Sequence, residues 1–208
     1  MKTGNDWTKP KTTAVVLAAG AGERSRALLK AELSDSTVAQ QALSTLRKVV
    51  NPEDIIVVVA PGDDEMRNLL GDDLTYVIQD EPLGTGHAVT AARYAIPEGT
   101  EQLLVTYADT PLLSASSLRG LLNRHALMDG DFSLLTAVVD QPLPYGRVER
   151  GADSRVVAIV EPEDLDEDEA EIREINVGSY VASPKALLRE IDDLAEDDEY
   201  RSGAPVHR

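Results

Sequence analysis

The chain has 208 residues, no cysteine and a formal net charge of −17 at pH 7. This length favours one large domain over two, and the absence of cysteine excludes disulfides, thiolate metal sites and cysteine nucleophiles. So acidic a surface repels a phosphodiester backbone, so we expect no nucleic-acid partner.

Short apolar runs and helical spacings alternate along the first two thirds of the chain. Continuous apolar runs predict buried strands at 12–18, 54–60, 74–79, 103–108 and 132–139. Helical spacing of apolar residues predicts helices at 38–50, 86–95 and 114–128. This alternation predicts an α/β fold with a Rossmann-like, open, mainly parallel sheet covered by helices on both faces.

After Asp140 the pattern changes to shorter strand-like pieces separated by turns. These pieces lie at 145–148, 155–160 and 175–182, and a last helix is expected over 184–194. They predict a smaller mixed β lobe packed on the open sheet. We therefore divide the chain into a disordered extension (1–12), one domain (13–200) and a tail (201–208).

The termini and the apolar runs also bear on location. No apolar run is long enough to span a bilayer, so we expect no membrane partner. The polar segment Met1–Thr13 carries no signal-peptide core, which makes a cytoplasmic location the default expectation. The sequence leaves the oligomeric state open.

The acidic residues are unevenly distributed, and most of the excess lies between Glu161 and Glu199. The run Glu161–Glu169 suggests a calcium loop, but it has no glycine at the required turn position. We interpret it as a solvated helix start and loop. Three basic residues cluster near the N-terminus instead, so a local anion site is compatible with an acidic protein; they are Arg24, Arg26 and Lys30.

A glycine-containing loop, 17–24, follows the first predicted strand. Gly20 and Gly22 allow backbone N–H groups to approach an anion without obstruction by a Cβ. The loop lacks the Lys-Ser/Thr ending of a P-loop, and Ser25 stands where a dinucleotide fingerprint has its third glycine. Arg24 and Lys30 suit a triphosphate. The loop alone leaves nucleotide binding and an ordinary glycine turn equally open.

Three later motifs, in fitting order and separation, favour nucleotide binding. They are Val77 to Ala88 with Gln79 and Leu83-Gly84-Thr85-Gly86-His87, Tyr107-Ala108-Asp109, and Tyr145-Gly146-Arg147 followed by Glu161 and Glu174-Ile175-Asn176-Val177-Gly178. With the loop they resemble the uridyltransferase domain of the bifunctional N-acetylglucosamine-1-phosphate uridyltransferase/glucosamine-1-phosphate acetyltransferase, in the GT-A/Rossmann-like nucleotidyltransferase superfamily. The resemblance runs from about Thr13 to Leu188.

The resemblance implies a role for each matching position. It implies nucleotide binding by Leu17, Ala18, Ala19, Gly20, Gly22, Gln79, Gly84 and Thr85, with the Gln79 amide reading uracil. It implies that Asp109 holds Mg²⁺ and acts in catalysis with Arg24 and Lys30, which neutralise the triphosphate. It implies a sugar-phosphate site in the β lobe, at Gly146, Glu161 and Asn176.

Several positions depart from the pattern of the resembled family. Glu23, Leu29, Ala108 and Val177 replace threonine, proline, glycine and threonine of its motifs, and the loop before Lys30 is one residue shorter. After Tyr200 the family continues to an asparagine that is its second magnesium ligand. This sequence ends at Arg208, so we expect that ligand and the acetyltransferase domain to be absent.

Three functions therefore follow as hypotheses. The leading one is a Mg²⁺-dependent transfer of UMP from UTP to a sugar 1-phosphate, with N-acetylglucosamine 1-phosphate as the acceptor. The second is a molybdopterin-type nucleotidyltransferase. The third is a catalytically weak relative that binds nucleotide or a partner without turnover, motivated by Glu23, the shortened loop and the missing asparagine.

Overall fold

The computed structural model describes residues 10–20, 22–128, 130–141 and 143–196. Most of the predicted extension and all of the predicted tail lie outside these residues. The strands are β1 (Thr12–Leu17), β2 (Glu32–Leu33), β3 (Ser36–Thr37), β4 (Ile55–Val59), β5 (Thr75–Ile78), β6 (Gln102–Tyr107), β7 (Phe132–Val138), β8 (Arg147–Arg150), β9 (Val156–Val160) and β10 (Glu174–Ala182). The α-helices are α1 (Glu23–Lys30), α2 (Val38–Leu46), α3 (Asp64–Leu70), α4 (Thr85–Ala92), α5 (Ala115–Met128) and α6 (Pro184–Glu196). Short 3₁₀ helices occupy Pro52–Asp54, Arg93–Ala95 and Glu169–Glu171.

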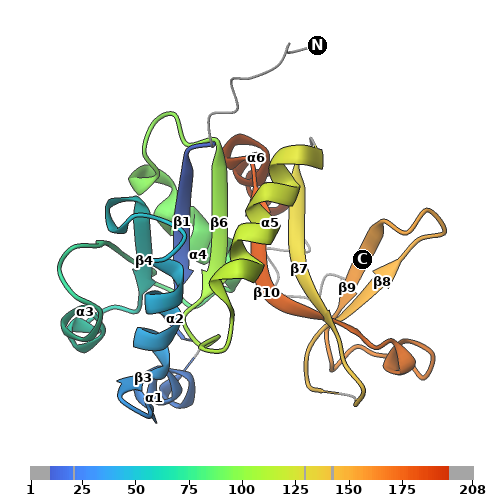
Figure 1. Ribbon diagram of the computed structural model, residues 1–208, viewed down its shortest axis with the longest axis horizontal. Coiled ribbons are helices and arrows are strands. Elements are labelled where there is room, and N and C mark those ends of the chain that lie inside the picture. The colour runs from blue at the N-terminus through green and yellow to red at the C-terminus, as the bar shows by residue number, and fades with distance from the viewer. Residues whose placement is uncertain (1–9, 21, 129, 142, 197–208) are drawn as a thin grey trace.

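The main sheet has the strand order β5-β4-β1-β6-β10-β8-β9, with β7 paired to β10. The strands β5, β4, β1 and β6 are parallel to one another, whereas β10 runs antiparallel to β6, β7 and β8. The hairpin β8–β9 projects beyond β10 (Figure 1). The predicted α/β class, open sheet and additional β lobe are therefore confirmed, with the parallel pairing confined to four strands.

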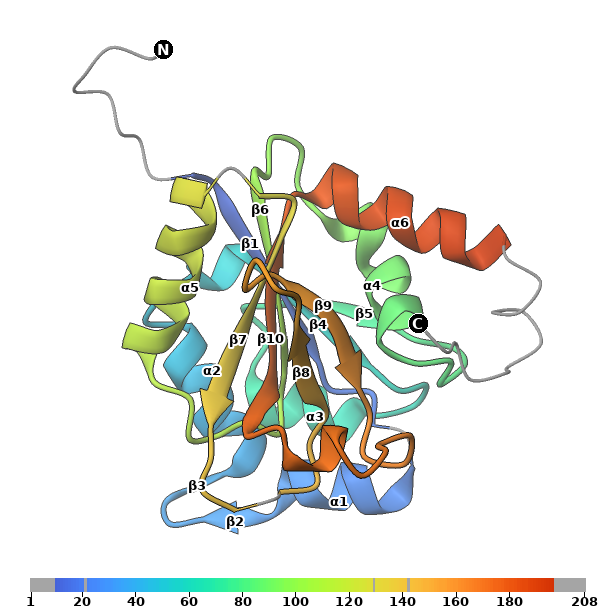
Figure 2. The ribbon, with the colours of Figure 1, turned by 90° about the vertical axis from the view of Figure 1, so that its right-hand side faces the viewer.

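Helices cover both faces of the sheet, as predicted. Alternate residues of β1 point to opposite faces: Ala14 and Val16 pack in the core with α2, α3 and α5, and Val15 and Leu17 pack in the core with α4 and α6. Figure 2 shows the two helical layers on either side of the sheet. This sandwich fixes the strands firmly, so the loops at their carboxyl ends start from rigid positions.

A bulge in β10 connects the parallel part of the sheet to the β lobe. The register with β7 shifts between Asn176 and Tyr180, and Gly178 within the shift has φ +79°. A Cβ at Gly178 would lie 2.8 and 2.9 Å from the ring carbons of Tyr107. Only glycine combines this left-handed backbone with so close an approach to an aromatic ring.

Several elements were not predicted or differ in extent. The helix α1 has only one buried residue, Leu29, so its sequence lacks the apolar periodicity that predicts a helix. The predicted helix 38–50 ends as α2 at Leu46, and Val49 and Val50 are buried in the turns that follow. The acidic run from Glu161 forms exposed turns and a 3₁₀ helix instead of the start of an α-helix.

Candidate active site

A cavity of about 270 Å³ opens at the carboxyl ends of the parallel strands β1, β5 and β6. In open α/β sheets this edge is where ligands bind. Its lining comes from the ends of these strands and the loops that follow them, from α1 and from the start of α4: Leu17, Ala19, Gly20, Ser25, Leu29, Gln79, Pro82, Gly84, Thr85, Ala88, Tyr107 and Asp109. The structure thus brings together most of the residues expected to bind nucleotide, and Asp109 with them.

Ala19 and Gly20 of the glycine loop line one side of this cavity. Ala18 continues the sheet by donating its N–H to the carbonyl of Val58 at 2.8 Å, and it is fully buried rather than exposed to the cavity. Gly20 has φ +60°, and a Cβ there would lie 3.2 to 3.3 Å from atoms of Ser25 and Arg26. Gly20 therefore makes a tight turn against the first residues of α1, and Gly22 precedes that helix without lining the cavity.

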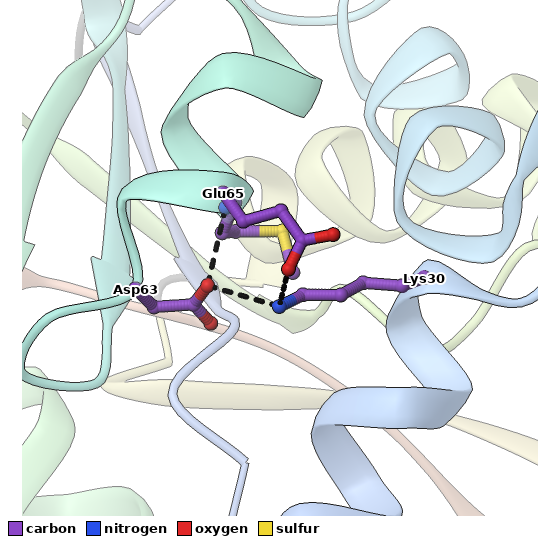
Figure 3. A network of polar contacts seen from close by, with 4 residues as sticks. Lys30, Asp63 and Glu65 are labelled. Atoms are coloured by element: carbon purple, nitrogen blue, oxygen red, sulfur yellow. Dashed lines mark hydrogen bonds and ion pairs between the residues drawn. The ribbon is translucent and has the colours of Figure 1, made fainter.

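The two basic residues expected at the triphosphate lie outside the cavity lining. Arg24 is exposed on α1. The Lys30 ammonium forms ion pairs with the carboxylates of Asp63 at 3.1 Å and Glu65 at 2.7 Å, as Figure 3 shows. The hydrogen bond to Glu65, followed by that to Asp63, raises the pKa of Lys30 against the effect of burial. In this state Lys30 joins α1 to the start of α3.

Asp63 is well suited to hold that lysine in place. Its side chain is 6% exposed, and Oδ1 accepts hydrogen bonds from both the Lys30 ammonium and the backbone N–H of Met66. The second interaction caps α3. Within the described residues, the buried Oδ2 has no hydrogen-bond partner.

Gln79 lies at the end of β5, where it reaches across to α4. Its backbone N–H donates to the carbonyl of Val59 at 2.9 Å. Its side-chain Nε2 lies 3.1 Å from the carbonyl oxygen of Gly84 and 3.2 Å from Nδ1 of His87. Gly84, with φ +99°, turns the chain into α4. A buried glutamine is therefore anchored on one side and borders the cavity on the other.

Tyr107 and Asp109 stand at the end of β6. The Tyr107 hydroxyl and the Thr85 hydroxyl are 2.7 Å apart, which ties β6 to the start of α4. Burial raises the pKa of the Tyr107 phenol, and the charges of Asp109 and Glu161 add to that effect. Burial also raises the pKa of the Asp109 carboxyl, although part of its side chain is exposed to solvent.

The three predicted sugar-phosphate residues meet one another in the β lobe, outside the cavity lining. The backbone N–H of Asn176 donates to the carbonyl of Gly146 at 2.9 Å, and a Cβ on Gly146 would lie 3.4 Å from both carboxylate oxygens of Glu161. Burial raises the pKa of Glu161, with the nearby Glu163 and Asp164 acting in the same direction. Glu161 also raises the pKa of Tyr107, so the two groups of residues are electrostatic neighbours.

Sequence reasoning assigned no role to Tyr107 and Tyr180, two residues that shape this site. The side chain of Asn176 donates through Nδ2 to the Tyr180 hydroxyl at 2.7 Å, while its Oδ1 accepts the backbone N–H of Gly178 at 3.0 Å. Tyr107 lines the cavity, and its ring lies against Gly178. The signal that could have found Tyr107 was its position two residues before Asp109, at a strand end.

The residues present fit a magnesium ion that is shared with a bound substrate. No cluster of three or more His, Asp or Glu residues that could hold a metal occurs in the described part of the chain. Mg²⁺ in phosphoryl-transfer sites, however, is commonly held by one or two carboxylates together with substrate phosphates and waters. The solvent-accessible carboxyl of Asp109, at the wall of the cavity, meets that requirement.

The fold and the position of the cavity define a class of protein, the open α/β-sheet proteins with a ligand site at the carboxyl ends of their parallel strands. A structure from Anaerococcus prevotii described as 4-diphosphocytidyl-2C-methyl-D-erythritol synthase superposes with a TM-score of 0.66 at 16% identity, covering 92% of this chain and 79% of that one. A structure from Thermus thermophilus, described as a mannose-1-phosphate geranyltransferase, gives a TM-score of 0.67 at 24% identity, covering 94% and 68%. These similarities establish the fold.

Residues 14–204 match the MobA-like NTP transferase domain, and the chain belongs to that family. The bifunctional protein GlmU of Heliobacterium modesticaldum is 41% identical over 189 residues, which cover 88% of this chain and 41% of that protein. GlmU of Brevibacillus brevis is 37% identical over 190 residues, covering 90% of this chain and 41% of that protein. The chain thus spans about two fifths of the length of these relatives.

Proposed function

We propose that the chain transfers UMP from UTP to a sugar 1-phosphate, with N-acetylglucosamine 1-phosphate as the acceptor. The observation that carries this proposal is the meeting of Gln79, Thr85 and Asp109 in one cavity beside the glycine loop. Three segments far apart in sequence supply, at one place, a base-reading amide, a hydroxyl and a carboxylate. The similarity to GlmU supports uridine as the nucleoside and a sugar phosphate as the acceptor.

The reaction requires positioning and charge neutralisation more than a covalent nucleophile. An oxygen of the sugar phosphate attacks the α-phosphorus of UTP. The new P–O bond forms as the bond to the β-phosphate's bridging oxygen breaks, and pyrophosphate leaves. The glycine loop would place its N–H groups against the phosphates, and Gln79 would fix the base. The Tyr107–Thr85 contact holds the two walls of the cavity at a fixed separation.

Asp109 would hold Mg²⁺ against the phosphates, and the ion would supply charge neutralisation at the oxygens of the nucleotide. Gly146, Glu161 and Asn176 would bind the sugar phosphate, since Glu161 offers acceptors for hydroxyl groups and Gly146 lies close to its carboxylate. Lys30 would reach the triphosphate by exchanging Glu65 for a phosphate oxygen. Arg24, exposed on the same helix, would add a second cation.

The position of Glu161 in the β lobe supports a sugar phosphate as the acceptor. Burial raises the pKa values of Tyr107 and Tyr180, and the charge of Glu161 adds to both effects, so the Glu161 carboxylate lies near these two phenols. A sugar bound at Glu161 would lie near Tyr107, which also lines the cavity. None of the helices in the described residues is long and apolar enough to cross a membrane; the cytoplasmic location stays a prediction.

The experiment is a pyrophosphate-release assay with UTP, N-acetylglucosamine 1-phosphate and Mg²⁺, repeated with CTP and GTP and with other sugar 1-phosphates. We expect release to be fastest with UTP and to be abolished by Asp109→Ala. A preference for GTP would favour the molybdopterin-type reaction. Measurable UTP binding without release for any sugar phosphate would favour a relative that binds nucleotide without turnover.

A further inference from the structure

The hydrogen bonds of Gln79 fix which end of its amide faces the cavity. Gln79 is 6% exposed, and Nε2 lies within hydrogen-bond distance of the Gly84 carbonyl oxygen and of Nδ1 of His87. A carbonyl oxygen can only accept, so the group beside Gly84 must be the NH₂ end. The second hydrogen of that NH₂ then points to His87, whose Nδ1 must accept. His87 is therefore a neutral imidazole with its proton on Nε2.

This arrangement leaves the amide oxygen for the ligand. Both hydrogens of Nε2 are used within the protein, and Oε1 has no hydrogen-bond partner among the described residues. Oε1 is also not fully enclosed, and the residue borders the cavity. The cavity thus receives an acceptor and no donor from this side chain. An acceptor pairs with a ring N–H such as N3–H of uracil, whereas the corresponding nitrogen of cytosine is itself an acceptor.

We propose that His87 is a positioning residue that holds the Gln79 amide with its oxygen toward the cavity and so favours a uracil nucleotide over a cytosine nucleotide. A reversed amide would place Oε1 against two acceptors, the Gly84 carbonyl and the Nδ1 lone pair. With His87 as the Nε2–H tautomer the reversal breaks two hydrogen bonds, and without His87 it breaks only one; a switch of His87 to the Nδ1–H tautomer would restore one of the two. The inference rests on the proposed function in that it takes the cavity to be the nucleotide site.

The test compares two variants of the full chain by calorimetric binding of UTP and CTP. His87→Phe keeps an aromatic ring and removes the acceptor, and His87→Asn keeps an acceptor oxygen near the position of Nδ1. We expect His87→Phe to lower the ratio of UTP to CTP affinity by about tenfold, the size of one well-placed hydrogen bond. We expect His87→Asn to keep the ratio within about threefold of the wild type. Equal loss of both affinities in His87→Phe, or a wild type without preference for UTP over CTP, would overturn the inference.

Failure of this inference can be distinguished from failure of the proposed function, because the selectivity of binding is measured without turnover. A second measurement needs no ligand at all. Imidazole ¹⁵N NMR of the wild type should show His87 as the Nε2–H tautomer with a bare Nδ1. His125, whose Nδ1 lies 3.0 Å from the Ser133 hydroxyl, is a second folded histidine for assignment. A proton on Nδ1 of His87 would contradict the inference, since that nitrogen could then not accept from Gln79.

Discussion

The hydroxyl of Tyr107 lies 2.7 Å from the hydroxyl of Thr85, and this contact joins the end of β6 to the first residue of α4. Both residues border the cavity. The ring of Tyr107 in turn covers Gly178, in the bulge of β10. One side chain therefore connects the walls of this cavity with the strand that carries Asn176.

Removing this hydroxyl should affect ligand binding more than folding. We expect Tyr107→Phe to raise the KM for UTP by about three- to tenfold, because Thr85 loses the partner that fixes its side chain. The matched control is Tyr76→Phe, which removes a phenol that donates to the Gly71 carbonyl at 2.7 Å and does not border the cavity. Steady-state kinetics and urea unfolding of both variants provide the check. A Tyr107→Phe enzyme with the wild-type KM would show that the contact is structural only.

A methyl group at Gly178 should displace Tyr107. Gly178→Ala combines a positive φ with a contact of 2.8 Å to the tyrosine ring. We expect a loss of about 3 kcal/mol in the free energy of unfolding, from backbone strain plus overpacking. Gly99→Ala is the control, since Gly99 has φ +80° and an added Cβ would meet nothing within 4 Å. If urea denaturation gives equal losses for the two variants, the contact with Tyr107 contributes nothing.

The raised pKa of Asp109 should appear in the pH dependence of Mg²⁺ binding. The carboxyl must lose its proton to bind the ion, so affinity for Mg²⁺ in the presence of UTP should fall as the pH drops through this raised pKa, at a higher pH than for an ordinary aspartate. The folded state holds this proton more tightly than the unfolded state does, so ionisation destabilises the fold as the pH rises through the same range.

Asp109→Asn should therefore abolish turnover and slightly raise stability at neutral pH, by less than about 1 kcal/mol because solvent screens the partly exposed carboxyl. Calorimetric Mg²⁺ titrations across pH and thermal unfolding test the two statements. A variant less stable than the wild type at neutral pH would contradict the conclusion that the ionised Asp109 carboxylate, needed for Mg²⁺ binding, lowers the stability of the fold.

Removing the ion pair between Lys30 and Glu65 should strengthen the binding of UTP. We expect Glu65→Gln to lower the KM for UTP by about two- to fivefold, since an exposed ion pair of this kind contributes up to about 1 kcal/mol. Asp73→Asn is the control, because it breaks a comparable surface pair with Arg47 that does not border the cavity. An unchanged KM together with lower stability would make Lys30 a structural tie between α1 and α3.

The sequence predicted the central fold well because the physical signal was strong. The strands β1, β4 and β6 are continuous apolar runs, buried on both faces, and their alternation with helices determines a parallel sheet. The helices α1 and α3 were missed because they are short and bury few residues, Leu29 in the first and Met66 with Leu70 in the second. The register shift at Gly178 depends on pairing between distant strands, and no local pattern encodes it.

The same distinction applies to the site. The strand-end positions of Gln79 and Asp109 follow from the strands that precede them, so their convergence could be expected from topology. The hydrogen-bond and ion-pair partners of the site's side chains could not be expected from topology. The pairing of Lys30 with Asp63 and Glu65 joins segments more than 30 residues apart, and it depends on how α1 packs beside α3. The contact between Gln79 and His87 depends in the same way on the turn at Gly84.

The most direct test of the central claim is the identity of the transferred group. The protein would be incubated with UTP labelled at the α-phosphorus, N-acetylglucosamine 1-phosphate and Mg²⁺, and the products separated. We expect the label in UDP-N-acetylglucosamine, with one pyrophosphate released for each sugar nucleotide formed and no product from Asp109→Ala. Label that remains entirely in UTP or appears as free UMP, with protein that still binds UTP, would contradict the claim.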